Sequence, residues 1–306
     1  MQELQRNHIH STYFAPRGAA RIYALGMQLA QLYLSPADKI IGFVGEAGSG
    51  KSMLIKGMFP GIELTNDDNG VNIRPLPLLE QDFETGFFSP HTYHVDIRFE
   101  NGFTQMNRLA DAIVQAVQRG KRVIIEHFDL IYPFLKENAD LLIGVGEEIV
   151  ITRPNIFGPE PDFVGNIVYK SLPYRLMAHT AEDLCEFCIP PEEMARCSHD
   201  DVRHGFVLVF PDHAPNFDLQ ELEKQVQAMI DRHIPITYAD ERHIRIGDAI
   251  HACTGPRTHV SNTSQIQNFH LLPHVIYDRI NNRYLVVGCV GENSEERLHT
   301  LSKMHE

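Results

Sequence analysis

The chain has 306 residues, a length that favours two domains, each able to bury a core of its own. Its 27 basic and 40 acidic residues give a formal net charge of −13, which argues against general DNA binding and against attachment to an anionic membrane. The composition is typical of a globular soluble protein, and no apolar run reaches the ~18–20 residues that span a bilayer.

The N-terminus and the cysteines bear on the cellular compartment. The first eight residues lack the apolar core of a signal peptide. The five cysteines are an odd number at low density, which argues against a disulfide framework and favours free thiols or metal ligands. We therefore expect a cytoplasmic protein.

The first predicted elements surround a glycine-rich motif. A helix is predicted over residues 16–34, and it either caps the following domain or takes part in its function. A β-branched apolar run over residues 39–44 is typical of a buried strand, and a helix starts over residues 52–59. Between strand and helix lies the phosphate-binding P-loop pattern G-x-x-x-x-G-K-S. Its residues are Gly45, Glu46, Ala47, Gly48, Ser49, Gly50, Lys51 and Ser52.

The chemistry of phosphate binding explains why these residue types occur together. The three glycines permit backbone angles that let successive N–H groups point into one concavity, where the helix dipole also favours an anion. Lys51 is a candidate catalytic residue because it reaches the β- and γ-phosphates, and the Ser52 hydroxyl is a candidate Mg²⁺ ligand. The motif therefore predicts a site for ATP with Mg²⁺.

Two carboxylates follow the next predicted strand, over residues 61–65. Asp67 and Asp68 lie in a turn predicted over residues 66–70. At the end of a strand in such a domain, they are candidates to face the phosphoryl acceptor or Mg²⁺. They are equally typical of a simple turn.

Another acid closes an apolar strand predicted over residues 122–126. Glu126 is the first candidate, and Asp129 the second, for the acid that binds Mg²⁺ directly or through water. The same pattern also fits a buried strand followed by a helix-capping acid. Strands over residues 94–99 and 139–146 and a helix over residues 103–119 complete an alternation that predicts a parallel sheet with helices on both faces.

The stretches at residues 45–52, 123–126 and 129–143 together resemble P-loop kinases of the uridine-kinase kind. The resemblance implies an α/β fold of the P-loop NTPase type over residues 1–150, and phosphoryl transfer from ATP in nucleoside or tRNA metabolism. Kinases of that kind continue into a lid that carries arginines, whereas Arg153 is the only arginine near this point. A domain that binds ATP without kinase activity is therefore an alternative.

A different pattern begins near residue 147. Apolar and polar residues alternate over residues 147–169, with glycines and prolines between them, which predicts short antiparallel strands. Helices are predicted over residues 174–187 and 219–233. Residues 179–184, with the sequence HTAEDL, lie within the first of these helices. Residues 258–263, with the sequence THVSNT, follow the second.

These two segments, with Cys253, are similar to the second additional domain of alanyl-tRNA synthetase, which threonyl-tRNA synthetase and free-standing alanyl editing proteins share. The resemblance covers roughly residues 170–292. It implies an α+β editing-like domain over residues 151–306, with a nucleoside, aminoacyl or tRNA-end ligand. The family binds zinc through an H-x-x-x-H helix and a later Cys–His pair, which implies as Zn²⁺ ligands His179, Asp183, Cys253 and His259.

Two features of this ligand set depart from the family. Asp183 takes the place of the second histidine, and five residues rather than three separate Cys253 from His259. The set remains coherent, because His179 and Asp183 at i, i+4 share one helix face and all four side chains are zinc-ligand types. The alternative is a domain that kept the fold and lost the metal. Should Asp183 not bind, the substitute ligand is one of the helical pair Cys185 and Cys188, whose other interpretation is ordinary helix packing.

Three functions are compatible with these patterns. The first is an ATP-dependent phosphotransferase of nucleoside or tRNA metabolism with a degenerate editing-like domain. The second is an ATP-regulated ligand- or RNA-binding protein without kinase activity. The third is a zinc-dependent aminoacyl-tRNA deacylase, which the altered ligand set places last.

Overall fold

The computed structural model describes residues 10–62, 64, 91–211 and 213–292. The chain forms two compact units. Unit 1 comprises Met1–Ala15 and Arg21–Lys170, and unit 2 comprises Pro16–Ala20 and Ser171–Glu306. The predicted division after residue 150 falls inside a strand of unit 1, β6 (Glu148–Thr152), whereas the units divide within helix α8 (Pro161–Cys188).

Unit 1 is built on a six-stranded sheet in the order β1-β6-β5-β2-β4-β3. Its strands are β1 (Ser11–Phe14), β2 (Ile40–Val44), β3 (Thr92–Asp96), β4 (Arg122–Glu126), β5 (Leu141–Val145) and β6. The strands β3, β4, β2 and β5 are parallel, whereas β6 and β1 add in antiparallel register at one edge. Unit 1 is therefore α/β with a mixed sheet, and the prediction of a parallel sheet is wrong at this edge. The reason is the tight connection from β5 to β6, since so short a link joins only antiparallel strands.

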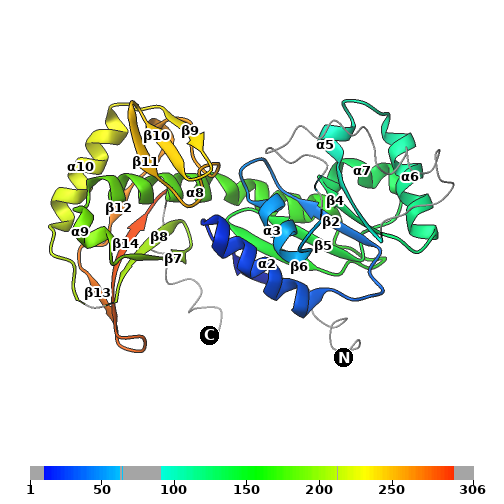
Figure 1. Cartoon of the computed structure of the whole chain (residues 1–306), viewed down its shortest axis with the longest axis horizontal. Coiled ribbons are helices and arrows are strands. Elements are labelled where there is room, and N and C mark those ends of the chain that lie inside the picture. The colour runs from blue at the N-terminus through cyan, green and yellow to red at the C-terminus, as the bar shows by residue number, and fades with distance from the viewer. Residues whose placement is uncertain (1–9, 63, 65–90, 212, 293–306) are drawn as a thin grey trace. The chain divides into compact units, whose positions relative to one another are not determined.

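Helices cover both faces of this sheet, as the sequence predicted (Figure 1). One face carries Ile41 and Phe43 of β2 and packs against α2 (Ala19–Tyr33) and α3 (Lys51–Met58). The other face carries Ile40 and Val44 and packs against α6 (Met106–Gln118), α7 (Phe128–Leu135) and the start of α8. Successive strand residues point to opposite faces, so a wholly apolar strand such as β2 fills both cores.

Two predicted strands of unit 1 differ from the structure. The strand predicted over residues 94–99 stops at Asp96, whose carboxylate accepts a hydrogen bond from the Phe99 N–H at 3.2 Å. Asp96 thereby caps a short helix, α5 (Ile97–Glu100). Of the strand predicted over residues 61–65, Gly61 and Ile62 are in no strand, and Glu63 and Thr65 lie outside the described residues.

Unit 2 contains two antiparallel sheets. In the five-stranded sheet β13 pairs with β14 beside the path β12-β14-β8-β7, and the three-stranded sheet has the order β11-β10-β9. Its strands are β7 (Ser198–Val202), β8 (Gly205–Phe210), β9 (Ile236–Asp240), β10 (His243–Ile246), β11 (Ala249–Ala252), β12 (His270–Leu271), β13 (Ile276–Asp278) and β14 (Arg283–Cys289). Its helices are the end of α8, α9 (Pro191–Met194) and α10 (Leu219–Asp231), with a 3-10 turn at Thr263–Gln265.

Helix α8 replaces the short antiparallel strands predicted over residues 147–169, and only β6 forms there. Pro161 begins the helix, at a position where no backbone N–H is needed. Val164, Val168 and Leu172 then recur every four residues as buried side chains, which is a helical period. Although α8 has 28 residues, neither it nor another described helix is long and apolar enough to cross a membrane.

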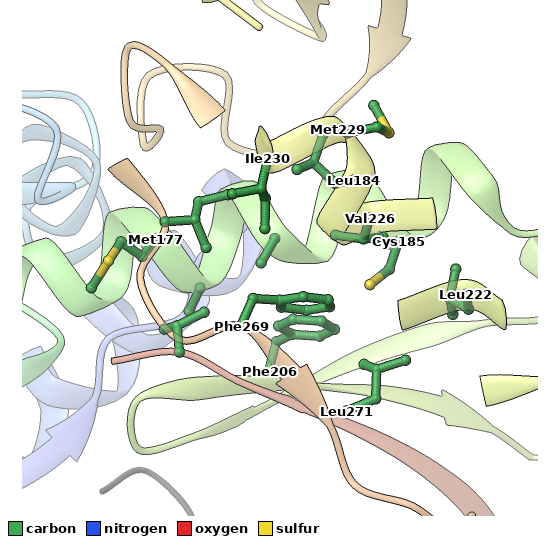
Figure 2. Close-up of a cluster of buried hydrophobic side chains, with 14 of the residues drawn as sticks. Met177, Leu184, Cys185, Phe206, Leu222, Val226, Met229, Ile230, Phe269 and Leu271 are labelled. Carbon is green, nitrogen blue, oxygen red and sulfur yellow. The ribbon is translucent and has the colours of Figure 1, made fainter. Parts of the chain in front are cut away.

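The core of unit 2 lies between α8, α10 and the five-stranded sheet (Figure 2). Phe206 of β8 is fully buried there, beside Leu184 of α8 and Val226 of α10. Its ring lies over Gly288 of the paired strand β14, where an added Cβ would come within 2.3 Å of the ring. The packing of this core therefore requires the large side chain of Phe206 to lie against a glycine, Gly288.

We expect Phe206→Ala to destabilise unit 2 by about 3–5 kcal/mol, because the substitution removes buried apolar surface and leaves a cavity. Urea unfolding followed by circular dichroism measures the loss. Ile280→Ala, at a side chain that is 93% exposed, is the control and should change stability by no more than about 0.5 kcal/mol. Equal effects of the two substitutions would contradict this account of the core.

Candidate functional sites

The first candidate site lies at the end of β2, where the chain turns into α3 through the glycine loop, which we define as residues 45–50. Gly45, Gly48 and Gly50 have φ values of 153°, 79° and 92°, which side chains of L-residues resist. Gly45 has a second constraint, since an added Cβ would lie 2.5 Å from the Val145 carbonyl oxygen. The glycines predicted from the sequence are thus required by the shape of the loop.

Lys51 and Ser52, the first residues of α3, both face Glu126. The Lys51 ammonium donates to the Glu46 carbonyl at 3.0 Å and lies 3.8 Å from Glu126 Oε2. The Ser52 hydroxyl donates to Glu126 Oε1 at 3.3 Å. Burial lowers the pKa of the Lys51 ammonium, and the charge of Glu126 opposes that shift. Three residues that the sequence singled out therefore lie together, and of these Lys51 and Glu126 are buried whereas Ser52 is exposed.

Glu126 owes its place to the register of the parallel strands. It ends β4, opposite Phe43 of β2 and Asp96 of β3, so the carboxyl ends of all three strands meet at the glycine loop. Its Oε1 also lies 3.1 Å from His94 Nε2. Burial acts to raise the pKa of Glu126, but the His94 hydrogen bond and the charges of His94 and Lys51 outweigh it, so this pKa lies below its usual value.

Asp96, Glu126 and His127 each offer one donor atom within 4.8 Å of the others, a spacing that suits a cation. Sequence reasoning missed Asp96 and His94. The alternation over residues 94–99 predicted a strand. Its one acid, Asp96, was the available signal for the site, because the carboxyl ends of neighbouring parallel strands meet at one edge of a sheet.

Asp129, the second choice for the Mg²⁺ acid, accepts a hydrogen bond from the Tyr169 hydroxyl at 2.9 Å and is not in the Asp96–Glu126–His127 group. Asp67 and Asp68 lie outside the described residues. Glu46 of the glycine loop is bound through both carboxylate oxygens to Arg98 of α5, at 2.7 and 2.8 Å. That pair places an arginine beside the loop, which the sequence analysis did not identify.

Glu100 of α5 gives this region a dependence on pH. Only 1% of the residue is exposed, and its Oε2 is buried without a hydrogen-bond partner. Burial, and then the charge of Asp96, raises the pKa of Glu100 from 4.5 to about 7. A raised acid pKa means that the associated stability is complete below the unfolded-state value and is lost as the pH rises through about 7.

We therefore expect Glu100→Gln to stabilise the protein at pH 8 by roughly 2–3 kcal/mol, since no buried carboxylate then has to ionise. At pH 4.5 the variant and the parent should unfold at similar urea concentrations. Glu137→Gln, at an exposed position of the same unit, is the matched control and should leave stability unchanged at both pH values. A gain that does not depend on pH would contradict the role of ionisation.

The second candidate site lies in unit 2 and unites two distant segments. His179 and Asp183 come from α8, and Cys253 and His259 from the connection that follows β11. One donor atom of each lies within 4.8 Å of the other three. The structure thus brings together the four residues implied as zinc ligands, and their role as ligands stays a prediction.

The distances within this group are those of a compact donor set. Cys253 Sγ lies 3.4 Å from His179 Nε2 and 3.7 Å from His259 Nε2. His259 Nε2 lies 2.9 Å from Asp183 Oδ2. Tetrahedral bonds of 2.0–2.3 Å separate neighbouring donors by about 3.3–3.8 Å, so the two sulfur–nitrogen distances already fit. Burial is nearly complete, with 2% of His179 and 3% of Asp183 exposed.

Groups around the donors fix their orientation. His179 Nδ1 lies 3.2 Å from Glu182 Oε2, which leaves Nε2 for the cluster. The Gly255 N–H donates to Cys253 Sγ at 3.2 Å, a contact that favours the thiolate, although burial and then the charge of Asp183 raise the pKa of this thiol. Gly255 has no room for a side chain, because an added Cβ would lie 2.4 Å from the Arg17 carbonyl oxygen.

The substitute ligands named from the sequence are not needed. Cys185 belongs to the hydrophobic core of unit 2, and the Cys188 thiol contacts Met229 Sδ at 3.7 Å. Neither is part of a donor group with His179. The interpretation of this C-x-x-C as helix packing is the one that the structure supports.

Comparison with known proteins adds no family. No family model matches the chain, and no curated protein matches it. The two candidate sites are therefore supported only by the residues of this chain.

Proposed function

We propose that unit 1 is a P-loop domain that binds ATP with Mg²⁺ on the glycine loop and transfers a phosphoryl group to an acceptor of nucleoside or tRNA metabolism. The observation that carries this proposal is the meeting of Lys51, Ser52 and Glu126 at the start of α3. A glycine-rich turn with an unrelated lysine would place no buried acid against both side chains. The type of acceptor rests on the resemblance of residues 45–52, 123–126 and 129–143 to uridine-kinase-like proteins.

The glycine loop has the features that a phosphate site needs. Ser49 Oγ is fully buried and makes no hydrogen bond within the described residues. The Lys51 ammonium donates to the Glu46 carbonyl, which a phosphate would replace. Ser52 and Glu126 would hold Mg²⁺, with Asp96 nearby, and Mg²⁺ would neutralise charge on the phosphates.

The second candidate function is ATP-regulated binding without kinase activity, and one observation favours it. Arg153, the only candidate for a lid arginine, is bound to Asp38 at 2.7 and 3.0 Å. Asp38 precedes β2, at the end of the strand opposite the glycine loop. Arg98 is the arginine beside the loop, and its bond to Glu46 would have to break before it could reach a phosphate. A product screen with labelled ATP and nucleosides separates the two functions.

We expect Lys51→Ala to abolish the thermal stabilisation of unit 1 by ATP, because the phosphates lose their buried partner. In the parent, linkage gives ~2.7 kcal/mol when ATP is at about 100 times its Kd. Differential scanning calorimetry with and without ATP measures the effect. Lys56→Ala, in the same helix but outside the loop, is the matched control and should keep the stabilisation.

Glu126→Gln tests the cation separately within the same experiment. It should retain some ATP binding and lose the enhancement by Mg²⁺. If Lys51→Ala gains as much stability from ATP as the parent does, the nucleotide site is elsewhere. If only Glu126→Gln behaves as the parent does, the cation lies on Asp96 or on residues not described.

For unit 2 we propose that His179, Asp183, Cys253 and His259 hold Zn²⁺. The support is the donor set itself: two imidazoles, a thiolate and a carboxylate, which are the ligand types of protein zinc sites. Bound zinc would tie α8 to the connection after β11. The aspartate in place of a histidine favours a binding role for this editing-like unit, with a nucleoside, aminoacyl or tRNA-end ligand, over deacylase activity.

We expect the purified protein to contain one zinc per chain, measured by inductively coupled plasma mass spectrometry. Cys253→Ser should lose most of it, and a chelator should lower the melting temperature of unit 2 before that of unit 1. Cys197→Ser removes a thiol outside the cluster and serves as the control. Full zinc content in Cys253→Ser would contradict the assignment.

A further inference from the structure

A second group of donor atoms adjoins the four-residue cluster of unit 2. Asp183, Glu186 and His251 each offer one ligand atom within 4.8 Å of the others, and Asp183 belongs to both groups. Asp183 and Glu186, at i, i+3, share one face of α8. His251 comes from β11. The proposed zinc site uses neither Glu186 nor His251.

His251 contributes a ring nitrogen to this second group. That nitrogen, Nε2, is buried and makes no hydrogen bond within the part of the chain that the structure describes. The nearest Glu186 oxygen lies 4.0 Å away, which is too long for a hydrogen bond but within the spacing of two ligands on one ion. A buried imidazole nitrogen without a partner is costly unless something binds it.

The charges around Glu186 also favour a cation beside this residue. Glu182, Asp183 and Glu186 lie within five consecutive residues of α8. Arg17 neutralises Glu182, and the cluster histidine His259 contacts Asp183. His199 Nδ1 lies 3.3 Å from Glu186, but Glu182 shares the same nitrogen at 3.3 Å. A cation beside Glu186 would supply the charge that this face of the helix lacks.

We propose that Asp183, Glu186 and His251 bind a second divalent cation, next to the zinc site, with the Asp183 carboxylate shared between the two ions. The sharing rests on the proposed zinc site, whereas binding at Glu186 and His251 does not. Two carboxylates and one imidazole, without a thiolate, suit Mn²⁺ or a similar first-row cation. His199 is a positioning residue, because its imidazole holds the other oxygen of Glu186.

This second site differs from the first in its access to solvent. The side chains of His251 and Glu186 are 15% and 16% exposed, whereas those of His179 and Asp183 are 2% and 4% exposed. Three protein ligands leave coordination positions for water or for an oxygen of a bound ligand. The second ion is therefore the one placed to meet a ligand, and the buried one is placed to hold the fold.

The test is a titration of the zinc-loaded full chain with Mn²⁺, followed by the electron paramagnetic resonance of free Mn²⁺. The parent should bind one more Mn²⁺ per chain than Glu186→Gln or His251→Gln, or bind it at least about tenfold more tightly. Glu192→Gln is the matched control, because it removes an exposed acid of unit 2 that belongs to neither donor group, and it should leave this ion in place. Circular dichroism checks that each variant is folded.

A further variant separates this proposal from the zinc site. Cys253→Ser should lose the thiolate-to-cobalt absorption of Co²⁺-loaded protein and still bind the Mn²⁺ that depends on Glu186. If no cobalt band appears in the parent, the zinc assignment fails and the Mn²⁺ titration still decides the second site. If Glu186→Gln and His251→Gln both bind Mn²⁺ as the parent does, the second site is overturned.

Discussion

The ion pair between Arg17 and Glu182 is what allows α8 to carry ionisable side chains into the interior of unit 2. Arg17 donates to both Glu182 oxygens, at 3.0 and 3.2 Å, and to the Gly205 carbonyl at 3.0 Å. A buried carboxylate without such a partner costs several kcal/mol. Burial would raise the pKa of Glu182, but the charge of Arg17 and the hydrogen bonds from His179 and His199 hold it well below its usual range.

The Arg17–Glu182 ion pair influences the four-residue cluster through the imidazole of His179. Glu182 holds His179 by Nδ1, so Nε2 of the same ring faces Cys253. The segment Pro16–Ala20 belongs to unit 2, although the residues on either side of it belong to unit 1. The hydrogen bonds of Arg17 explain why this segment belongs to unit 2, since its partners are in α8, β7 and β8.

In unit 1 the charge of a buried carboxylate, Glu126, is compensated by Lys51 and His94. If unit 1 binds a nucleotide as proposed, phosphate would draw Lys51 from Glu126, and a cation would restore the balance.

Local patterns in the sequence predicted much of the fold and part of both sites. Gly45, Gly48 and Gly50, between a predicted strand and a predicted helix, indicated a loop, because glycine adopts backbone angles that other residues resist. The i, i+4 pair of His179 and Asp183 follows from helical geometry alone. Over residues 147–169 the prediction of short antiparallel strands is confirmed for β6 and wrong for α8. The glycines and prolines there resemble turns between strands, whereas Val164, Val168 and Leu172 carry the helical period.

What the sequence could not predict depends on contacts between distant segments. Arg17 precedes Glu182 by 165 residues, and no periodicity links them. Asp96 reaches Glu126 only through the register of β3 with β4. His251 precedes the candidate ligand Cys253 by two residues, and its orientation depends on the pairing of β11 with β10.

The aspartate at position 183 has a chemical consequence that a histidine there would not have. A neutral imidazole presents one nitrogen acceptor toward a metal, whereas a carboxylate has two oxygens and about four lone-pair sites. Asp183 Oδ2 lies 2.9 Å from His259 Nε2, and the same carboxylate also lies within reach of Glu186 and His251. An imidazole would serve the first group alone, and would leave Glu186 and His251 without a third donor. Asp183 is thus the residue common to the two donor groups, and its carboxylate is what the two proposed metal sites would share.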